Sequence, residues 1–212
     1  MAVRGESVRE VDPEIATFSV TVSARDRDRQ ETLRRLAARV ETLRGVLDRY
    51  DESIEKRETS GLYVRPETKR SGERISAYSG SVTTTVTVSD FTALGELMLR
   101  LADQDQTAIA GPWWALRPGS PVHREARRAA IDDAVVRGRE YAEALGARIT
   151  GLVEVADSGM SAQSTPQYLA MGFRGSTDAG GPPVLDLDPQ RQTVTATVEA
   201  RFKISEPPSL AG

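Results

Sequence analysis

The chain has no cysteine, a single histidine and only two tryptophans among its 212 residues. The lack of cysteine excludes disulfide bonds and thiolate metal sites. One histidine cannot supply a metal site that needs two or three of them. A run of about 18 apolar residues is also missing, so we expect no membrane-spanning helix. The first 14 residues lack the basic start and apolar middle of a secretory signal, so we expect a cytoplasmic protein.

The net charge of the chain excludes one class of partner. The formal net charge is −3 and the sequence pI is about 5.4. A dedicated nucleic-acid-binding protein needs a basic footprint, so we expect no nucleic-acid partner. Gly-rich pieces such as Gly180-Gly181 are followed by prolines and do not open a helix, so they do not predict a phosphate-binding loop. We therefore expect no cofactor.

The clearest pattern is a strand over residues 78–88, in which apolar and hydroxyl side chains alternate. Successive strand side chains point to opposite faces, so one face is apolar and the other carries threonines such as Thr83 and Thr85. This pattern indicates a half-buried antiparallel strand with helices against its apolar side. A partner strand precedes it from Thr59, across a charged loop.

Further strands are predicted over residues 2–11, 15–24, 107–117, 148–156 and 193–204. Asp12-Pro13 is a turn signal, and so short a link predicts a β-hairpin of the first two strands. Gly111-Pro112 interrupts the strand at 107–117, which indicates an edge or a bulge.

Apolar residues at helical spacing predict helices that begin near residues 28, 90 and 120. At the first, Asp28 and Glu31 resemble a capping box. Arginines and acids such as Arg39 and Glu41 are interleaved around this helix, which indicates a solvated outer face.

The third predicted helix begins at Ser120-Pro121 and ends at Gly146. Small residues recur on it every four positions, so we expect its backbone to lie close to a sheet or another helix. The glycine among them costs about 0.5–1 kcal/mol relative to alanine, and close packing is the expected compensation. The small residues are Ala126, Ala130, Ala134, Gly138 and Ala142.

These elements predict an α+β fold with mainly antiparallel sheets and three helices packed on one side. We expect a single domain over residues 1–206, and a division into two lobes with a hinge near residues 104–107 stays open. Residues 157–190 are rich in Ser, Gly and Pro and are predicted to form a long mobile loop. Residues 207–212 are predicted to be a disordered tail.

No catalytic or metal-binding set is recognisable in the sequence. His123 lies in the first turn of a predicted helix and is interpreted as a surface residue. Asp132 and Asp133 are adjacent on that helix, so their side chains diverge by about 100° and cannot share a proton. Asp186 and Asp188 offer oxygens to Ca²⁺, but the ligand count and turn glycine of an EF-hand are missing.

Aromatic residues supply the candidate contact sites. Trp113 and Trp114 are adjacent on a predicted strand, so one should enter the core and the other should point outward. The outward ring is either an interface anchor or ligand platform, or it is sheltered under a helix or loop. Tyr168, Met171 and Phe173 are apolar residues in the long loop, and such residues often dock onto the same subunit or a neighbour.

A series of motifs follows in a recognisable order along the chain. It consists of Gly5-Glu6, Val11–Ala16, Thr59–Leu62, Tyr78–Val88, Glu125–Ala134 and the T-V-T-A-T-V strand at 193–198. Their order and spacing resemble the SIMPL-domain family, which includes a bacterial periplasmic immunogenic protein and a metazoan kinase-associated signalling protein. The resemblance implies α+β subunits, some of which assemble into large homo-oligomers. It also implies roles in stress defence or as adaptors, without established catalytic residues.

From this resemblance and the missing catalytic set we expect a non-enzymatic, self-assembling scaffold or binding module, with itself as its partner. One alternative is a small-molecule-binding protein or cryptic hydrolase with a pocket under the loop at 157–190. A second alternative is a signalling adaptor, by analogy alone.

Overall fold

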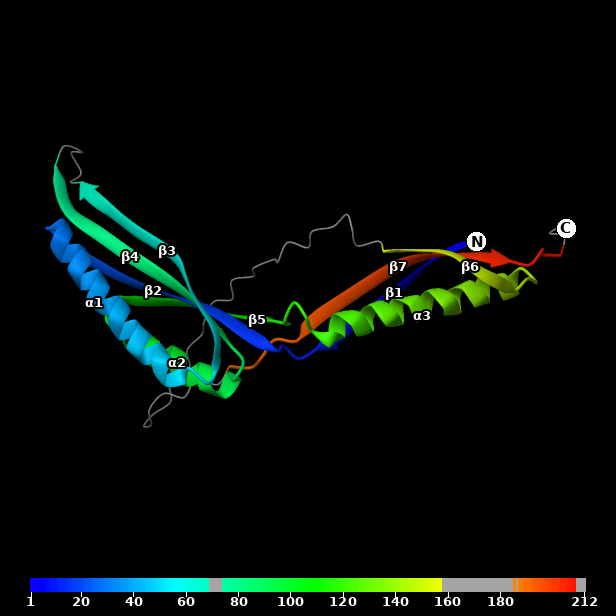
Figure 1. Cartoon of the computed structure of the whole chain (residues 1–212), viewed down its shortest axis with the longest axis horizontal. Coiled ribbons are helices and arrows are strands. Elements are labelled where there is room, and N and C mark those ends of the chain that lie inside the picture. The colour runs from blue at the N-terminus through cyan, green and yellow to red at the C-terminus, as the bar shows by residue number, and fades with distance from the viewer. Residues whose placement is uncertain (69–73, 158–184, 186, 209–212) are drawn as a thin grey trace. The chain divides into compact units, whose positions relative to one another are not determined.

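The computed structural model describes residues 1–68, 74–157, 185 and 187–208 (Figure 1). Within these ranges it shows three α-helices and only antiparallel strand pairs, which confirms the predicted α+β class.

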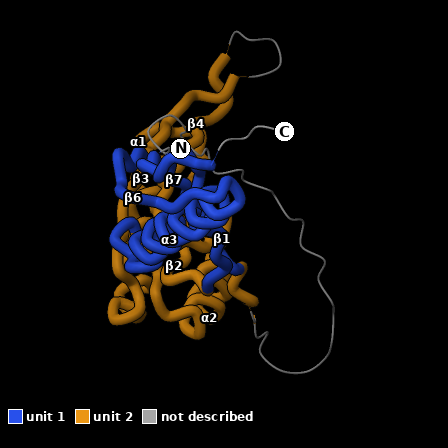
Figure 2. Tube along the Cα trace, turned by 90° about the vertical axis from the view of Figure 1, so that its right-hand side faces the viewer, with its two compact units in different colours: residues 1–11, 118–178, 191–212 blue, residues 12–117, 179–190 orange. Residues whose placement is uncertain are grey.

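The chain divides into two compact units, each with its own hydrophobic core (Figure 2). Unit 1 comprises residues 1–11, 118–178 and 191–212. Unit 2 comprises residues 12–117 and 179–190. Residues 104–107, the predicted hinge, lie inside unit 2 between a helix and a strand. The hinge and the single-domain boundary at residue 206 stay predictions.

Unit 2 is a four-stranded antiparallel sheet in the order β3-β4-β2-β5, and α1 and α2 pack against its apolar face (Figure 1). Along the chain its elements are β2 (Ile15–Asp26), α1 (Arg29–Leu47), the short 3₁₀ helix η1 (Asp48–Tyr50), β3 (Ile54–Thr68), β4 (Ile75–Val88), α2 (Phe91–Ala102) and β5 (Thr107–Ala115).

The core of unit 2 follows the predicted alternation. Val82, Val86 and Val88 of β4 are buried, as are Phe18 and Val20 of β2. On the opposite face the hydroxyls are half-buried and form a cross-strand hydrogen bond, with 2.8 Å between Thr21 Oγ1 and Thr83 Oγ1. The alternation of the sequence therefore identifies the helix-covered face of this sheet.

A segment far along the chain completes this core. Leu185 and Leu187 pack against it from outside the sheet. Gly95 of α2 allows the approach, because a Cβ at that position would lie 2.2 Å from the Leu185 carbonyl oxygen. Part of the segment predicted as a mobile loop thus belongs to unit 2, and residues 158–184 and 186 lie outside the described residues.

Unit 1 is a three-stranded antiparallel sheet in the order β1-β7-β6, with α3 against β1 and β7 (Figure 1). Its elements are β1 (Ala2–Val11), α3 (Pro121–Ala144), β6 (Ile149–Asp157) and β7 (Gln192–Ile204).

The stripe of small residues on α3 is buried over its whole length, as predicted. A Cβ at Gly138 would lie 2.9 Å from the Phe202 ring. A Cβ at Gly5 of β1 would lie 2.0 Å from the Ala130 carbonyl oxygen. Helix and sheet therefore approach so closely that two glycines are required, one on each side.

The predicted hairpin of β1 and β2 is wrong. β1 pairs with β7 along its whole length, from Ala2 opposite Arg201 to Val11 opposite Gln192. β2 is an inner strand whose two edges pair with β4 and β5, so no edge remains for β1. The short link at Asp12-Pro13 instead carries the chain from one unit to the other.

The predicted helix ends are largely confirmed. Asp28, Asp90 and Ser120 each accept a hydrogen bond from a backbone N–H of the first turn of their helix. Gly146 follows α3 with a φ of +69°, a conformation that glycine adopts at little cost. In the described part of the chain, no helix is long and apolar enough to cross a membrane.

Candidate functional site

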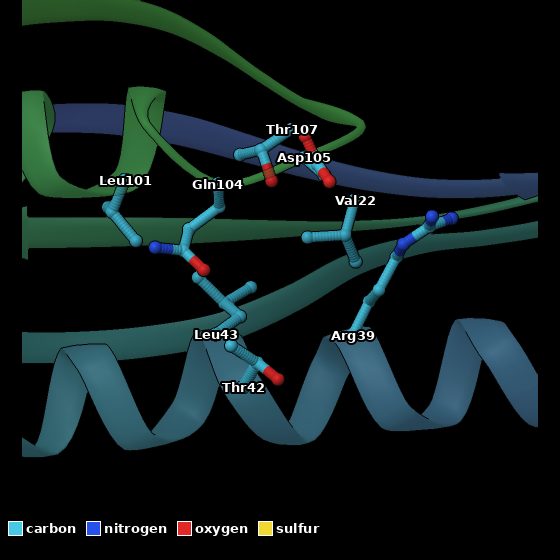
Figure 3. A pocket seen from close by; sticks show the side chains of 8 residues that line it. All are labelled: Val22, Arg39, Thr42, Leu43, Leu101, Gln104, Asp105 and Thr107. Carbon is cyan, nitrogen blue, oxygen red and sulfur yellow. The ribbon is translucent and has the colours of Figure 1, made fainter.

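A cavity of about 200 Å³ lies in unit 2, where the second half of α1 meets the turn between α2 and β5 (Figure 3). Its apolar lining consists of Val22, Leu43 and Leu101, which are all buried. Its polar lining consists of Arg39, Thr42, Gln104, Asp105 and Thr107. In Figure 3 the Gln104 amide and the Arg39 guanidinium lie on either side of Val22.

Hydrogen bonds through Ser23 hold two sides of this cavity together. Arg39 Nη1 donates to the Ser23 carbonyl oxygen. Ser23 donates to the Gln106 carbonyl oxygen twice, from its N at 2.9 Å and from its Oγ at 3.2 Å. Gln106 has a φ of 58°, which is uncommon for a residue other than glycine. The turn at the rim is therefore fixed to β2, and β2 is fixed to α1.

Arg39 differs from the arginines one turn before it. Arg34 and Arg35 both bind the Glu31 carboxylate, at 2.8 Å and 2.7 Å. Arg39 makes no ion pair with a carboxylate among the residues that the structure describes, and it is half-buried. Arg39 is therefore only partly on the predicted solvated face, because its guanidinium reaches the Ser23 carbonyl oxygen of β2.

No pattern in the sequence indicates this cavity. Arg39 and Asp105 are far apart in the chain, and they line one space only after α1 and α2 have packed side by side. Gln106 marks the site locally by its positive φ, but this backbone conformation cannot be read from residue types alone.

Unit 1 carries an exposed apolar surface on α3 and β6, which we call the α3–β6 surface. It consists of Leu152, Val153 and Val155 on β6 and of Ile131 on the flank of α3 toward β6. Val136 and Tyr141 of α3 and Leu145 at its C-cap are also exposed, on other sides of the helix. β6 is an edge strand, and α3 packs mainly against β1 and β7.

The two tryptophans face opposite ways, as predicted. Trp114 packs against the core of unit 2, where its ring meets the Phe91 ring edge-on at 4.8 Å between centroids. Trp113 remains 39% exposed on β5, an edge strand. Its role as an interface anchor stays a prediction. Tyr168, Met171 and Phe173 lie outside the described residues.

His123 lies in the first turn of α3, beside Arg124 and Arg127 at a surface hollow. The described residues that line this hollow include no carboxylate.

Asp133 accepts a hydrogen bond from the Glu6 N–H at 2.9 Å and binds Arg137 at 2.9 Å, and these contacts lower the pKa of the Asp133 carboxyl. Within the described ranges, no three His, Asp or Glu side chains are grouped to hold a metal ion, and Asp186 lies outside those ranges.

Two further clusters of polar and charged side chains connect elements of unit 2. The hydrogen bonds from Arg34 and Arg35 lower the pKa of the Glu31 carboxyl to about 2. Burial and a hydrogen bond with Glu96 raise the pKa of the Tyr50 hydroxyl, and Arg100 lies 5.9 Å from the centre of the Tyr50 ring. These groups join neighbouring parts of α1, η1 and α2, and none of them lines the cavity.

The comparison with protein families decides the chain's identity. A family model described as "SIMPL: Protein of unknown function (DUF541)" matches residues 1–202. The chain belongs to the SIMPL family. No curated protein matches this SIMPL chain. The family description names no activity, so it assigns none to the cavity or to the α3–β6 surface.

Proposed function

We propose that this SIMPL chain is a non-enzymatic, self-assembling binding module whose copies meet through the α3–β6 surface. The observation that carries the proposal is the exposed apolar centre of β6. Leu152, Val153 and Val155 are exposed by 61%, 64% and 45%. A monomeric protein rarely keeps so many apolar side chains together on an edge strand.

The other three sheet edges carry features that oppose association. β3 contains Lys56, Glu58 and Pro66, and β5 contains Pro112. On β1 the Glu6 N–H is already bound by the Asp133 carboxylate of α3. Charge, proline and a covered edge are the usual ways in which proteins block edge pairing. β6 contains no proline or lysine, and its central charge, Glu154, pairs with Arg201 of the neighbouring strand β7, so β6 is the edge least protected against a second chain.

Residues of α3 extend the apolar surface of β6. Asp133 and Val135 lie about 100° to either side of Ala134, which faces the sheet. Because Asp133 contacts β1, Val135 and Ile131 (one turn earlier) lie on the flank toward β6. Leu152 is opposite Phe202, and Phe202 lies against Gly138 of α3, so Leu152 is on the helix-covered face.

Register shifts in β6 support a side-chain contact. The shift between Leu152 and Glu154 brings Leu152 and Val155 to the same face, opposite Phe202 and Ala200. Such bulges interrupt a regular backbone ladder. The contact that we propose is therefore packing of the α3–β6 surfaces of two copies against each other, about a twofold axis.

The size of this surface fits a second copy of the chain. The 24 residues of α3 span about 36 Å, and a helix beside one strand is about 15 Å wide. Two such faces cover at most about 1,100 Å² in total, so nearly the whole length of α3 must join the contact to reach the area of about 1,000 Å² that a specific interface needs. A twofold contact also places the apolar centre of β6 against itself, which is the usual geometry of a homodimer.

The non-enzymatic part of the proposal rests on the surroundings of the reactive side chains. His123 stands beside two arginines, whose guanidinium groups offer no acceptor to orient its ring. The cavity of unit 2 holds an arginine and an aspartate but neither histidine nor serine. The side chains that line this cavity can bind a small molecule, but they do not form a recognisable catalytic set.

Light scattering after size-exclusion chromatography of the full chain tests the self-assembly. The wild-type chain should have a mass at least twice its subunit mass of 23.1 kDa. Leu152→Glu places a charge in the apolar contact, so the dissociation constant should rise at least about tenfold. Leu62→Glu is the matched control, because Leu62 of β3 is 62% exposed in the other unit and should leave the mass unchanged.

Two results would contradict this interface. One is a wild-type chain that stays at its subunit mass at about 100 μM, well above the dissociation constant of a specific dimer. The other is an oligomer that Leu152→Glu leaves intact while Trp113→Ala dissociates it, which would favour an interface at Trp113. The cytoplasmic location, the stress role and the adaptor role stay predictions.

A further inference from the structure

The cavity of unit 2 has the composition of a binding site for a small charged molecule. Val22, Leu43 and Leu101 form an apolar surface that is at least 97% buried. In Figure 3 Arg39 stands beside Val22, and Asp105 lies above Val22 in the turn before β5. Cavities that bind small molecules usually combine apolar walls with a few polar groups that fix orientation.

The Arg39 guanidinium is oriented before a ligand arrives. One of its N–H groups is used by the Ser23 carbonyl oxygen. A guanidinium carries five N–H donors, so the remaining donors can bind a carboxylate. The described residues place no carboxylate within ion-pair distance of Arg39, although Arg34 and Arg35 on the same helix share Glu31.

Asp105 supplies the opposite charge. It is exposed at the rim of the cavity, and the structure gives it no ion pair within the described parts of the chain. Its position is set by its neighbour Gln106, whose carbonyl oxygen accepts two hydrogen bonds from Ser23. The positive φ of Gln106 is a strained conformation of the kind that occurs at binding sites.

The volume limits the size of the ligand. About 200 Å³ equals the liquid volume of roughly six or seven water molecules. That space is below the range of drug-sized pockets and suits a molecule of roughly ten non-hydrogen atoms or fewer.

We propose that this cavity binds a small zwitterion of the α-amino acid class with an aliphatic side chain. Arg39 binds the carboxylate, Asp105 binds the ammonium group, and the side chain lies on Val22, Leu43 and Leu101. Gln104, Thr42 and Thr107 offer further hydrogen-bonding groups around the same space. This binding activity goes beyond self-assembly, because the cavity lies in unit 2 and the proposed interface lies in unit 1.

Equilibrium dialysis of the full chain against radiolabelled L-leucine tests the proposal. Saturable binding of one leucine per chain is expected, with a dissociation constant at or below about 1 mM. Arg39→Gln should raise that constant at least about tenfold, because it removes a charge-assisted hydrogen bond. Arg44→Gln is the matched control, because Arg44 is an exposed arginine of the same helix that does not line the cavity.

Competition with one analogue, together with one variant, separates the two charges. The carboxylic acid 4-methylpentanoate lacks the ammonium group and should compete at least about fivefold more weakly than leucine. Asp105→Asn should weaken leucine binding to that same level, whereas Asp103→Asn, in the same turn but outside the cavity, should not. Both aspartates are exposed, so neither change threatens folding.

Three outcomes would overturn the proposal. They are the lack of saturable leucine binding below about 1 mM, equal binding by the wild-type chain and Arg39→Gln, and an equal loss in Arg44→Gln. Competition by 4-methylpentanoate as strong as that by leucine would overturn the role of Asp105. Leu152→Glu should bind leucine like the wild-type chain, so failure of the proposed interface and failure of this site are separately visible.

Discussion

At the scale of single residues, the Glu31 carboxylate binds two arginines near the N-terminus of α1. The Glu31 N–H donates to the Asp28 carboxylate at 2.9 Å, as a capping box predicts. Its own carboxylate does not return to the Asp28 N–H, which binds Asp26 at 3.0 Å. It binds Arg34 and Arg35 instead. Only half of the predicted capping box forms, because two arginines one turn later compete for the carboxylate.

Glu31→Gln should therefore destabilise unit 2 in a pH-dependent way. The pKa of Glu31 is lowered from 4.5 to about 2, so its stabilising contribution is complete above pH 4.5 and is lost as the pH falls toward 2. The difference in unfolding free energy between the wild-type chain and Glu31→Gln should be constant near neutrality, shrink below pH 4.5 and vanish only below pH 2. Urea titrations followed by tryptophan fluorescence measure it. A difference that does not change with pH would show that the two arginines do not stabilise the ionised form.

At the scale of elements, the local part of the fold was predictable and the pairing was not. The five small residues of α3, spaced by four, identify its buried face without further information. The pairing of β1 with β7 joins residues such as Ala2 and Arg201 and depends on which sheet edges stay open, so no local pattern reveals it. The cavity at Arg39 was missed for the same reason, since its two charged groups meet only through helix packing.

Gly5→Ala is expected to loosen α3 from its sheet. The new Cβ would lie 2.0 Å from the Ala130 carbonyl oxygen and 2.6 Å from the Ala134 nitrogen, and backbone cannot move aside cheaply. The cost should be about 1–3 kcal/mol or more, as for other overpacked cores. Hydrogen exchange followed by mass spectrometry should show faster exchange in α3.

Gly151→Ala is the matched control, because Gly151 lies in β6 of the same unit and a Cβ there meets nothing within 4 Å. It should leave exchange in α3 unchanged. Equal effects of the two substitutions would mean that close helix packing is not what requires glycine at position 5.

At the scale of the whole molecule, the two units have cores of different size. The core of unit 2 contains Phe18 and several leucines from α1 and α2. The core of unit 1 contains Val3, Val198 and Phe202, and its other members are alanines. Because burial of apolar side chains is the main stabilising contribution, unit 1 should be the less stable unit when it stands alone. Packing of its α3–β6 surface against a second copy would offset that deficit.

Unfolding of the full chain should therefore show two transitions with different responses to protein concentration. Both tryptophans lie in unit 2, so their fluorescence reports that unit, whereas far-UV circular dichroism reports both. The dichroism should change first in urea. The midpoint of that first transition should rise with protein concentration, because association stabilises unit 1, while the fluorescence midpoint should stay constant.

The variant Leu152→Glu should abolish this dependence of the midpoint on protein concentration, and Leu62→Glu should keep it. Coincident transitions at every concentration would show that the two units unfold as one, and that assembly does not act on unit 1 alone.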